Sequence, residues 1–391
     1  MSKKTEVIIN LSNLEFNAKS ICEKFKDYKY RIGVLKSNAY GHGYKVVNSF
    51  IKGGINYIAV SYLSEALEIR KYNKDIPVLC MQPILIEDLD CVIKNDITIT
   101  IHSLNYLKEL ISVLKDKIKC HIKIDSGMNR LGLKYLDEVN ESYKLIKENK
   151  YIELEGIYTH LSTTGIFDKN WDNQISKFKR LTKDIDLNSI KIVHLYNSNS
   201  LLNHDKLDFA NGFRIGIALY GYNVNAHYTN SGTKNKLRNM RTSYYRKKYD
   251  ISKINYDIDI ELKRSMFMKT YLLDIKTIKK GESIGYGASK ITKDMIVGIL
   301  PIGYANGIGH SNNRYVLINN KKYHMIGQMS MNLMMVELDD KVTLDDEVIV
   351  LGKDITIGVL SRFNNKEVPE TLLEVGNNNI KTYVEDDTIW Q

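Results

Sequence analysis

The chain has 391 residues, of which 43% are hydrophobic and 26% charged, the composition of a globular protein with a large core. Its formal net charge of +10 is spread along the chain, which does not favour nucleic acid as a partner and is compatible with an anionic substrate or cofactor. No apolar run approaches ~18 residues and the first ten residues lack the apolar core of a signal peptide, so we expect a cytoplasmic protein without a membrane span.

The first half of the chain alternates short β-branched runs with longer amphipathic segments. The expected strands are residues 31–35, 57–60, 76–80, 97–101, 120–124, 154–158, 191–195 and 212–217. The segments of helical spacing between them include residues 64–74, 104–115, 138–150 and 173–184. About eight β/α units close a parallel barrel, whereas a doubly wound sheet is the alternative and no GxGxxG follows the first strand. We therefore predict an α/β fold with an N-terminal (β/α)8 TIM-type barrel over residues 11–221.

The second half of the chain changes character. Residues 222–256 are polar, basic and rich in tyrosine, which favours a solvated insertion or linker over a basic surface for nucleic acid. From residue 257 to 391, β-rich runs are separated by Gly, Asp and Asn turns, with helical spacing only at 371–376. This pattern predicts a C-terminal all-β domain, which also takes in residues 1–10.

Chemically useful residues follow the expected barrel strands, where active sites of parallel barrels lie. They are Lys36 and Tyr40 after the first strand, Lys123, Asp125 and Arg130 at the fifth, His160 at the sixth, His194, Asn197 and Ser198 at the seventh, and Arg214, Gly216 and Ile217 at the eighth. Each has an ordinary structural explanation when taken singly, but together they form a site. A strand-end lysine suits a Schiff base, and hydroxyls beside backbone amides suit a phosphate. This combination points to pyridoxal 5′-phosphate, and no metal-ligand set is apparent.

Eight motifs then make a specific match. They are VLKSNAYGHG, KIDSGMNRLG, YTHLS, HLYNS, FRIGIALYG, ESIGYGAS, LPIGYANG and GQMSMNLMM, in this order. By these motifs the chain resembles the alanine racemase family from about residue 6 to 381, apart from the insertion. The resemblance implies a pyridoxal-phosphate enzyme with a barrel, a C-terminal β domain and two active sites shared across a homodimer.

The resemblance also implies roles for individual residues. Lys36 carries the cofactor and is one catalytic base, and Tyr286 from the partner subunit is the other. His160 supports Tyr286, and Arg214 contacts the pyridine nitrogen. The remaining cofactor contacts implied are Tyr40, Asn197, Ser198, Gly216 and Ile217. The substrate contacts implied are Arg130, the backbone near Met331, and Tyr304 at the entrance. Lys123 matches a lysine that is carbamylated in some members.

Three departures from the family pattern stand out. Lys366 occupies the position of a phosphate-binding tyrosine, which bears on cofactor affinity. Asn332 replaces an aspartate and Ser330 a cysteine near the carboxylate pocket, which bears on specificity and turnover.

The leading hypothesis is racemisation of alanine that supplies D-alanine for peptidoglycan. A racemase of serine, lysine or another amino acid remains an alternative, as does a decarboxylase of the same fold type, although Tyr286 argues against a decarboxylase. The alternative outside the enzymes is a protein that carries a cofactor or binds nucleic acid and uses the insertion at 222–256.

Overall fold

The computed structural model describes residues 4–162, 169–222, 260–309 and 313–385, together with the single positions 233, 237, 240, 241 and 244. Most of the expected insertion at 222–256 therefore lies outside the described residues. Contacts within the chain divide it into two compact units. The barrel unit comprises Glu15–Lys36 and Val47–Lys263, and the C-terminal unit comprises Met1–Leu14, Ser37–Val46 and Arg264–Gln391. The domain boundaries expected at 11–221, 222–256 and 257–391 stay predictions.

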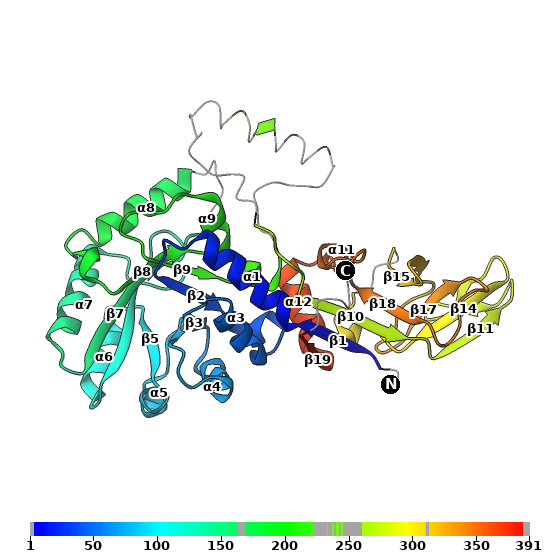
Figure 1. The fold of residues 1–391 in the computed structure, drawn as a ribbon, viewed down its shortest axis with the longest axis horizontal. Coiled ribbons are helices and arrows are strands. Elements are labelled where there is room, and N and C mark those ends of the chain that lie inside the picture. The colour runs from blue at the N-terminus through cyan, green and yellow to red at the C-terminus, as the bar shows by residue number, and fades with distance from the viewer. Residues whose placement is uncertain are drawn as a thin grey trace. The chain divides into compact units, whose positions relative to one another are not determined.

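Eight parallel strands close into a barrel, which confirms the predicted fold class (Figure 1). They are β2 (Tyr30–Val34), β3 (Tyr57–Val60), β4 (Val78–Cys80), β5 (Ile97–Ile101), β6 (Ile118–Ile124), β7 (Ile152–Thr159), β8 (Ile192–Tyr196) and β9 (Gly212–Ile215). The ring closes where Arg31 of β2 pairs with Phe213 of β9. These strands are rich in Ile and Val, as parallel strands buried on both faces are.

Helices lie around the outside of the barrel strands (Figure 1). They are α1 (Leu11–Lys24), α3 (Val47–Lys52), α4 (Leu63–Tyr72), α5 (Leu89–Lys94), α6 (Leu104–Val113), α7 (Leu136–Glu148), α8 (Lys169–Leu181) and α9 (Ser198–Asn203). Short 3₁₀ turns stand at η1 (Tyr44–Val46), η2 (Ile86–Asp88), η3 (Leu187–Ser189) and η4 (Ile217–Tyr220). Among the helices in the described ranges, none is long and apolar enough to cross a bilayer.

The C-terminal unit is built on antiparallel pairing. A six-stranded sheet has the order β16-β15-β18-β10-β1-β19. Its strands are β16 (Lys321–His324), β15 (Tyr315–Ile318), β18 (Glu347–Leu351), β10 (Met266–Tyr271), β1 (Glu6–Asn10) and β19 (Lys381–Val384). Because β1 pairs with both β10 and β19, the first strand of the chain is central to a sheet made otherwise of C-terminal residues. Strand β1 runs antiparallel to β10 and parallel to β19.

A second, three-stranded sheet has the order β11-β14-β17, with β11 (Asp274–Ile278), β14 (Met295–Leu300) and β17 (Met334–Leu338). Beside it, β12 (Ser283–Ile284) and β13 (Ser289–Lys290) form a short hairpin. Buried Ile284, Ile291 and Val297 form the apolar centre of this part. The unit also carries α11 (Ile357–Asn364) and α12 (Val368–Asn377), and the spacing at 371–376 predicted only the second of these helices.

The segment that follows Lys36 has an unusual backbone. Ser37, Asn38 and Ala39 all have left-handed dihedral angles, with φ of 53°, 55° and 52°, and Tyr40 follows with φ of 51°. Left-handed residues other than glycine cost about 1–2 kcal/mol each, so a run of four requires strong support from its surroundings. Helix α12 supplies part of it, because it packs closely against this turn.

The contact between α12 and the turn depends on the absence of side chains. A Cβ placed on Gly376 would lie 2.2 Å from the carbonyl oxygen of Gly41, which no small shift of a flexible side chain can relieve. We therefore predict that Gly376→Ala destabilises the protein by about 1–3 kcal/mol, the usual cost of overpacking. Thermal unfolding measures the effect.

Gly358→Ala is the matched control in α11. A Cβ there has Thr356 Oγ1 at 3.7 Å, an ordinary contact. Since alanine is the better helix former, this variant should be neutral or more stable by up to about 1 kcal/mol. Equal melting temperatures for the two variants would contradict the close packing of α12.

Candidate active site

Lys36 stands directly after the first barrel strand, β2, at the carboxyl end of the barrel. Burial lowers the pKa of its ammonium group, and the nearby Arg130 lowers it further, while Glu65 acts in the opposite direction. Glu65 is itself held by the backbone N–H of Ser61, at 2.7 Å from Oε2. A lysine in this environment has a larger neutral, nucleophilic fraction than an exposed one.

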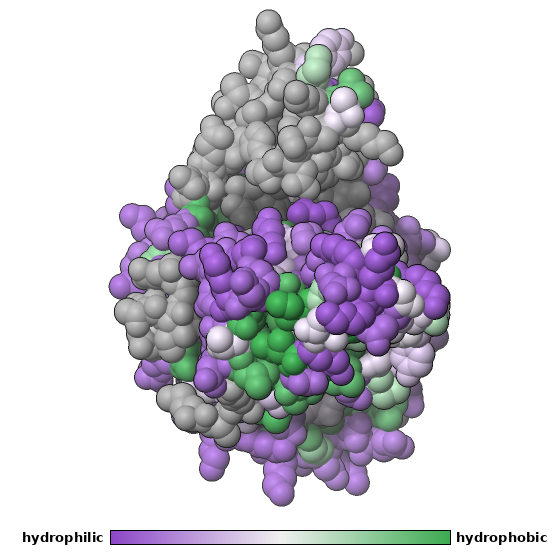
Figure 2. Space-filling model, turned by 90° about the vertical axis from the view of Figure 1, so that its right-hand side faces the viewer, coloured by the Kyte–Doolittle hydropathy of each residue, from purple (hydrophilic) through white to green (hydrophobic). Residues whose placement is uncertain are grey.

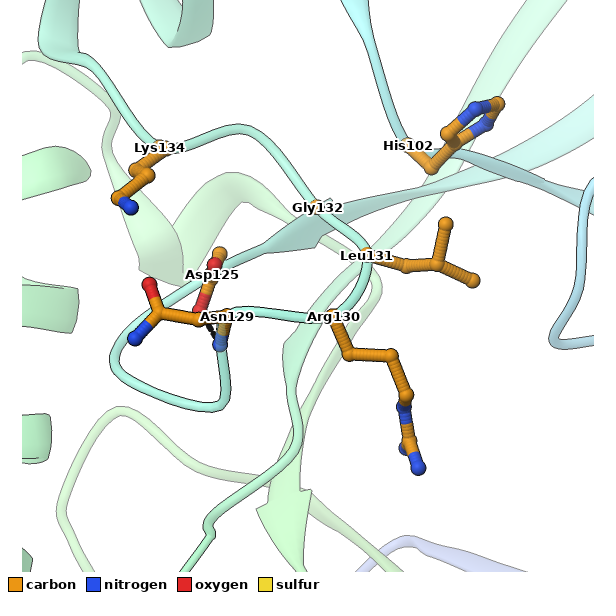
Figure 3. Close-up of a pocket in the computed structure, with 7 residues that line it drawn as sticks. All are labelled: His102, Asp125, Asn129, Arg130, Leu131, Gly132 and Lys134. Carbon is orange, nitrogen blue, oxygen red and sulfur yellow. Dashed lines mark hydrogen bonds between the residues drawn. The ribbon is translucent and has the colours of Figure 1, made fainter.

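Arg130 lies in the loop after β6, and this loop is shaped by Asp125. Asp125 Oδ1 accepts hydrogen bonds from the backbone N–H groups of Gly127, at 3.0 Å, and Asn129, at 2.9 Å. Figure 3 shows Arg130 extending from the loop in a different direction from His102 and Lys134, which line the same pocket of about 260 Å³. The side chains of this pocket therefore diverge. At the barrel end, burial lowers the pKa values of Lys36, Lys123 and His160, and the charge of Arg130 lowers them further.

Arg214 is buried at the carboxyl end of β9 and is held by five acceptors. Its Nη1 donates to His194 Nδ1 and to the carbonyl of His194, both at 2.8 Å, and its Nη2 donates to the carbonyl of Thr159 at 2.7 Å. Nη2 makes two longer contacts, to the carbonyl of Leu195 at 3.4 Å and to His160 Nδ1 at 3.5 Å. Within the part of the chain that the structure describes, Nε has no acceptor. Burial lowers the pKa of Arg214 to about 10, which leaves it a protonated donor at neutral pH.

His160 and Lys123 surround Arg214, and both have depressed pKa values. Burial lowers the pKa of His160 to about 3, with the positive charges of Arg214 and Arg130 adding to the effect. The imidazole is therefore neutral at physiological pH. Burial together with Arg214 and Arg130 lowers the pKa of Lys123 to about 8, and its ammonium lies 5.5 Å from the ring centre of Tyr158.

Ser198 and Gly216 meet at the ends of β8 and β9. The N–H of Gly216 donates to Ser198 Oγ at 3.1 Å, which leaves the hydroxyl hydrogen for another acceptor. Ile217 begins η4 next to Gly216. Asn197 has a structural task, because its Oδ1 caps α9 by accepting from the N–H of Ser200 at 3.0 Å. Hydroxyl and amide groups at this end of the barrel suit an anionic ligand such as a phosphate.

Tyr40 lies at the end of the left-handed turn, and burial raises its pKa to about 12. His42 holds this turn: its Nδ1 donates to the carbonyls of Ala39 and Tyr40, both at 3.1 Å. Its Nε2 then accepts from Ser265 Oγ at 3.0 Å. These contacts give His42 a structural role in holding the turn between Lys36 and Tyr40.

Tyr286, Tyr304 and Met331 belong to the C-terminal unit, and all three are exposed, by 68%, 42% and 54%. Tyr286 lies in the turn of the β12–β13 hairpin, between Gly285 and Gly287, which both have positive φ. Tyr304 begins η5 (Tyr304–Asn306), and the N–H of Ala305 donates to the carbonyl of Met331 at 3.0 Å. The structure thus brings Tyr304 and Met331 together within this unit.

The structure shows the surroundings of the three residues that depart from the family pattern, Lys366, Ser330 and Asn332. Lys366 forms an ion pair with Glu374, so its charge is already compensated within the C-terminal unit. Ser330 Oγ ties its own turn by bonding to the carbonyl and the N–H of Leu333, at 3.1 Å and 3.0 Å. Asn332 is exposed within the same turn.

Comparison with known proteins identifies the family. Residues 9–224 match the alanine racemase N-terminal domain and residues 265–383 match the alanine racemase C-terminal domain. The chain belongs to the alanine racemase family. Alanine racemases of Borreliella burgdorferi and Halalkalibacterium halodurans are each 32% identical to it, over 98% of both chains for the first, and over 93% of this chain and 92% of the relative for the second.

Solved structures agree with the family assignment. An alanine racemase of Clostridium difficile 630 matches all of this chain and 98% of its own, with a TM-score of 0.83 and 28% identity. At 24% identity, an alanine racemase of E. faecalis shares the fold with a TM-score of 0.85 and 98% of both chains covered. A histidine racemase of Leuconostoc mesenteroides subsp. sake also shares the fold, with a TM-score of 0.82, 20% identity and 98% of both chains covered.

Two residues connected to Arg214 from inside the barrel were not predicted from the sequence of this alanine racemase family member. His121 in β6 and Glu155 in β7 lie inside the barrel, in a hydrogen-bonded chain that ends at Arg214. The available signal was a histidine and a glutamate inside two strands that also carry other charged residues, Lys119 and Lys123 in β6 and Glu153 in β7. That signal alone does not distinguish the barrel interior from its surface, because a strand presents alternate residues to opposite faces.

The influence of Arg130 on Lys36 leads to a prediction. Removing a nearby cation raises the pKa of Lys36 and lowers its neutral fraction, so Arg130→Ala should slow the reaction of the Lys36 amine with an acylating reagent near pH 8. Mass spectrometry of the modified peptide, across a pH series, measures the rate. Lys134→Ala removes a cation from the same loop and is the control. An unchanged pH profile in Arg130→Ala would contradict the electrostatic coupling.

Proposed function

We propose that this protein interconverts L- and D-alanine with pyridoxal 5′-phosphate as cofactor. The observation that carries the proposal is the group of residues at the carboxyl end of the barrel, where Lys36 with its depressed pKa lies in the field of Arg130 and where Arg214 is held as a permanent donor. Membership of the alanine racemase family supports the reaction and the cofactor.

The residues at the barrel end fit this cofactor. Lys36 supplies an amine for covalent attachment, and the hydroxyl of Ser198 with the amides of Gly216 and Ile217 would hold the phosphate, joined by Tyr40 and Asn197. The Nε–H of Arg214, which has no acceptor among the described residues, suits the ring nitrogen as its partner. When bound, pyridoxal phosphate withdraws electron density from the substrate Cα and makes its proton acidic.

Arg214 and His160 would set the electrostatics around the reaction. A guanidinium only donates, so Arg214 disfavours a proton on the ring nitrogen facing it. This restrains the charge that the ring takes up and limits side reactions. His160 accepts from Arg214 through Nδ1 at 3.5 Å, so its Nε2 carries the hydrogen and is free to act as a donor toward Tyr286 in the assembled site.

Racemisation requires proton transfer on both faces of the Cα. Lys36 Nζ would serve one face and the Tyr286 hydroxyl, from the partner subunit of a homodimer, would serve the other. Arg130 and the backbone near Met331 would bind the substrate carboxylate, with Tyr304 at the entrance. The exposure of Tyr286, Tyr304 and Met331 supports a role at an interface between subunits.

An apolar area on the C-terminal unit is compatible with this homodimer. Figure 2 shows an apolar area surrounded by hydrophilic side chains on the face of the molecule that it presents. In the described part of this unit, exposed large apolar side chains include Leu273, Met331, Leu333 and Leu344. Exposed apolar surface of this kind is typical of protein interfaces.

A racemase of another amino acid is the second candidate. The histidine racemase shares the fold at 20% identity, so the fold does not by itself select the substrate side chain. Asn332, at a position where the family pattern has aspartate, leaves serine or lysine as alternatives. If alanine is the substrate, supply of D-alanine for peptidoglycan in the cytoplasm is the role that the family implies.

The test of the function is hydrogen exchange at Cα in D₂O. We expect the purified holoenzyme to exchange the α-proton of L- and D-alanine faster than that of serine, lysine or histidine, as followed by proton NMR. Lys36→Ala is the control and should lose both the exchange and the visible absorbance of bound cofactor. Exchange of another amino acid without that of alanine would overturn the assignment of substrate.

The role of Tyr286 has its own test. Because each base serves one face of the Cα, Tyr286→Phe should slow exchange from one enantiomer of alanine by about 100-fold or more and from the other far less. Initial exchange rates of the separate enantiomers measure this asymmetry. Tyr315→Phe, in the six-stranded sheet, is the control. Equal losses for both enantiomers in Tyr286→Phe would rule out a two-base mechanism.

A further inference from the structure

A chain of buried polar groups runs through the interior of the barrel, away from the proposed cofactor site. It begins at Arg214 in β9, continues through His194 in β8 and His121 in β6, and ends at Glu155 in β7. The distances are 2.8 Å from Arg214 Nη1 to His194 Nδ1, 2.9 Å from His194 Nε2 to His121 Nδ1, and 3.3 Å from His121 Nε2 to Glu155 Oε2. All four side chains are buried, where barrels of this type are usually filled by apolar layers.

The direction of every hydrogen bond in this chain follows from its two ends. A guanidinium only donates, so His194 Nδ1 must accept, and the hydrogen of neutral His194 is on Nε2. His121 Nδ1 must then accept from it, which places the hydrogen of His121 on Nε2, pointing at Glu155. An ionised carboxylate only accepts, so the chain ends without a conflict. One pair of histidine tautomers satisfies all three bonds.

Electrostatics keep both histidines neutral. Burial lowers the pKa of His194 well below its usual value, and the charge of Arg214 adds to this effect. Burial also lowers the pKa of His121, against the attraction of Glu155. A cationic His121 would donate from both of its ring nitrogens. His194 Nε2 would then have to accept, and the hydrogen of His194 would lie on Nδ1, pointing at the guanidinium.

The barrel is built around this chain. His121 pairs with Gly156 at a bulge in the pairing of β6 with β7, and a Cβ on Gly156 would lie 2.7 Å from the His121 ring. The ring of Tyr158 stacks on His194 at a distance of 4.7 Å between centres. A glycine opposite the imidazole and a stacked tyrosine hold both rings in their orientations.

Glu155 is anchored at the amino-terminal end of the barrel interior. Its Oε2 accepts from Tyr57 Oη at 2.6 Å and from Thr98 Oγ1 at 3.3 Å, and its Oε1 accepts from Lys191 Nζ at 2.7 Å. Burial raises the pKa of this carboxyl, but the hydrogen bonds from His121, Lys191 and Tyr57 outweigh burial and lower it. The group is therefore a fixed negative charge and a fixed acceptor.

We propose that Glu155 is a positioning residue for Arg214 and acts through the tautomers of His121 and His194. By always accepting from His121 Nε2, it keeps His194 Nδ1 an acceptor and so holds the guanidinium in place for the cofactor. The proposal rests on the proposed function only for the contact of Arg214 with the cofactor. The tautomers of His121 and His194 are a property of the protein without cofactor.

Loss of the acceptor at position 155 allows the chain to reverse. His121 can then turn its hydrogen to Nδ1 and donate to His194, and His194 in turn directs its Nδ1–H at Arg214. Two donors at 2.8 Å repel, so the guanidinium moves. Since an active-site group displaced by about 1 Å costs up to about 100-fold in rate, the effect should appear in kcat more than in KM.

Two variants separate the acceptor from the charge. Glu155→Gln keeps an acceptor for His121 and Tyr57 and directs its amide toward Lys191, whose side chain is 51% exposed and can turn into solvent. Glu155→Leu removes the acceptor. We expect Glu155→Leu to lower kcat for alanine by about 10- to 100-fold with little change in KM, and Glu155→Gln to lower it by less than about threefold. Tyr57→Phe removes one donor to Glu155 and should match Glu155→Gln.

The unsubstituted protein without cofactor supplies a test that needs neither activity nor a stable Glu155→Leu variant. Long-range ¹H–¹⁵N spectra of ¹⁵N-histidine protein should show His121 and His194 as neutral Nε2–H tautomers, assigned by the signals missing in His121→Asn and His194→Asn. Glu155→Gln should keep both tautomers. An Nδ1–H or cationic form of either histidine would overturn the proposal, as would equal losses of kcat in Glu155→Gln and Glu155→Leu. If the tautomers are as expected but alanine is not a substrate, the proposed function fails and the buried chain stands.

Discussion

The guanidinium of Arg214, held inside the closed barrel, is the constraint on which the rest of the site depends. Its Nη1 and Nη2 bond to His194 and to the carbonyl of Thr159, and burial together with its charge depresses the pKa values of His160 and Lys123. A charge buried this deeply is costly unless hydrogen bonds compensate it. The barrel supplies them to Nη1 and Nη2 from backbone carbonyls at the strand ends and from imidazole nitrogens. Among the described residues, Nε is left without an acceptor on the side of the proposed cofactor site.

The charge of Arg214 has its counterpart in Glu155, far from the reacting atoms. Two neutral imidazoles connect the groups, so the positive end faces the proposed cofactor site and the negative end lies among Tyr57, Thr98 and Lys191. Hydrogen bonds in a chain of this kind polarise one another in a medium of low dielectric constant. The interior of this barrel therefore contributes electrostatics to the site as well as packing.

The left-handed turn after Lys36 is the second unusual feature of the structure. It separates Lys36 in the barrel unit from Tyr40 in the C-terminal unit, within four residues of chain. His42, Ser265 and the bare Gly376 of α12 compensate the cost of this conformation. Strained backbone persists where the surrounding contacts determine it, and here His42 is local while Ser265 and Gly376 come from two distant parts of the sequence.

Much of the architecture was predictable because it depends on local pattern. The eight barrel strands appear as short Ile- and Val-rich runs between amphipathic segments, and all eight were expected within a few residues of their observed bounds. Helix α11 was not expected, because its eight residues are too few for the helical spacing of buried Ile357 and Leu360 to stand out between β18 and α12. Tyr286 was identified through its motif ESIGYGAS, whereas the hairpin that carries it was not predicted, because its strands have two residues each.

The sequence by itself determined which side chains follow the barrel strands, because the carboxyl ends of parallel strands meet at one end whatever their distance along the chain. Lys36, Arg130, His160 and Arg214 could be assigned to one site on that ground. Only the tertiary structure decided that His121 and Glu155 belong to the same hydrogen-bonded chain as Arg214. Alternation along a strand does not say which face is interior, and the bulge beside His121 shifts the register at the residue concerned. Closure of the barrel then brings β6, β7, β8 and β9 around one interior, and the hydrogen-bonding rules of arginine and carboxylate set the tautomers between them.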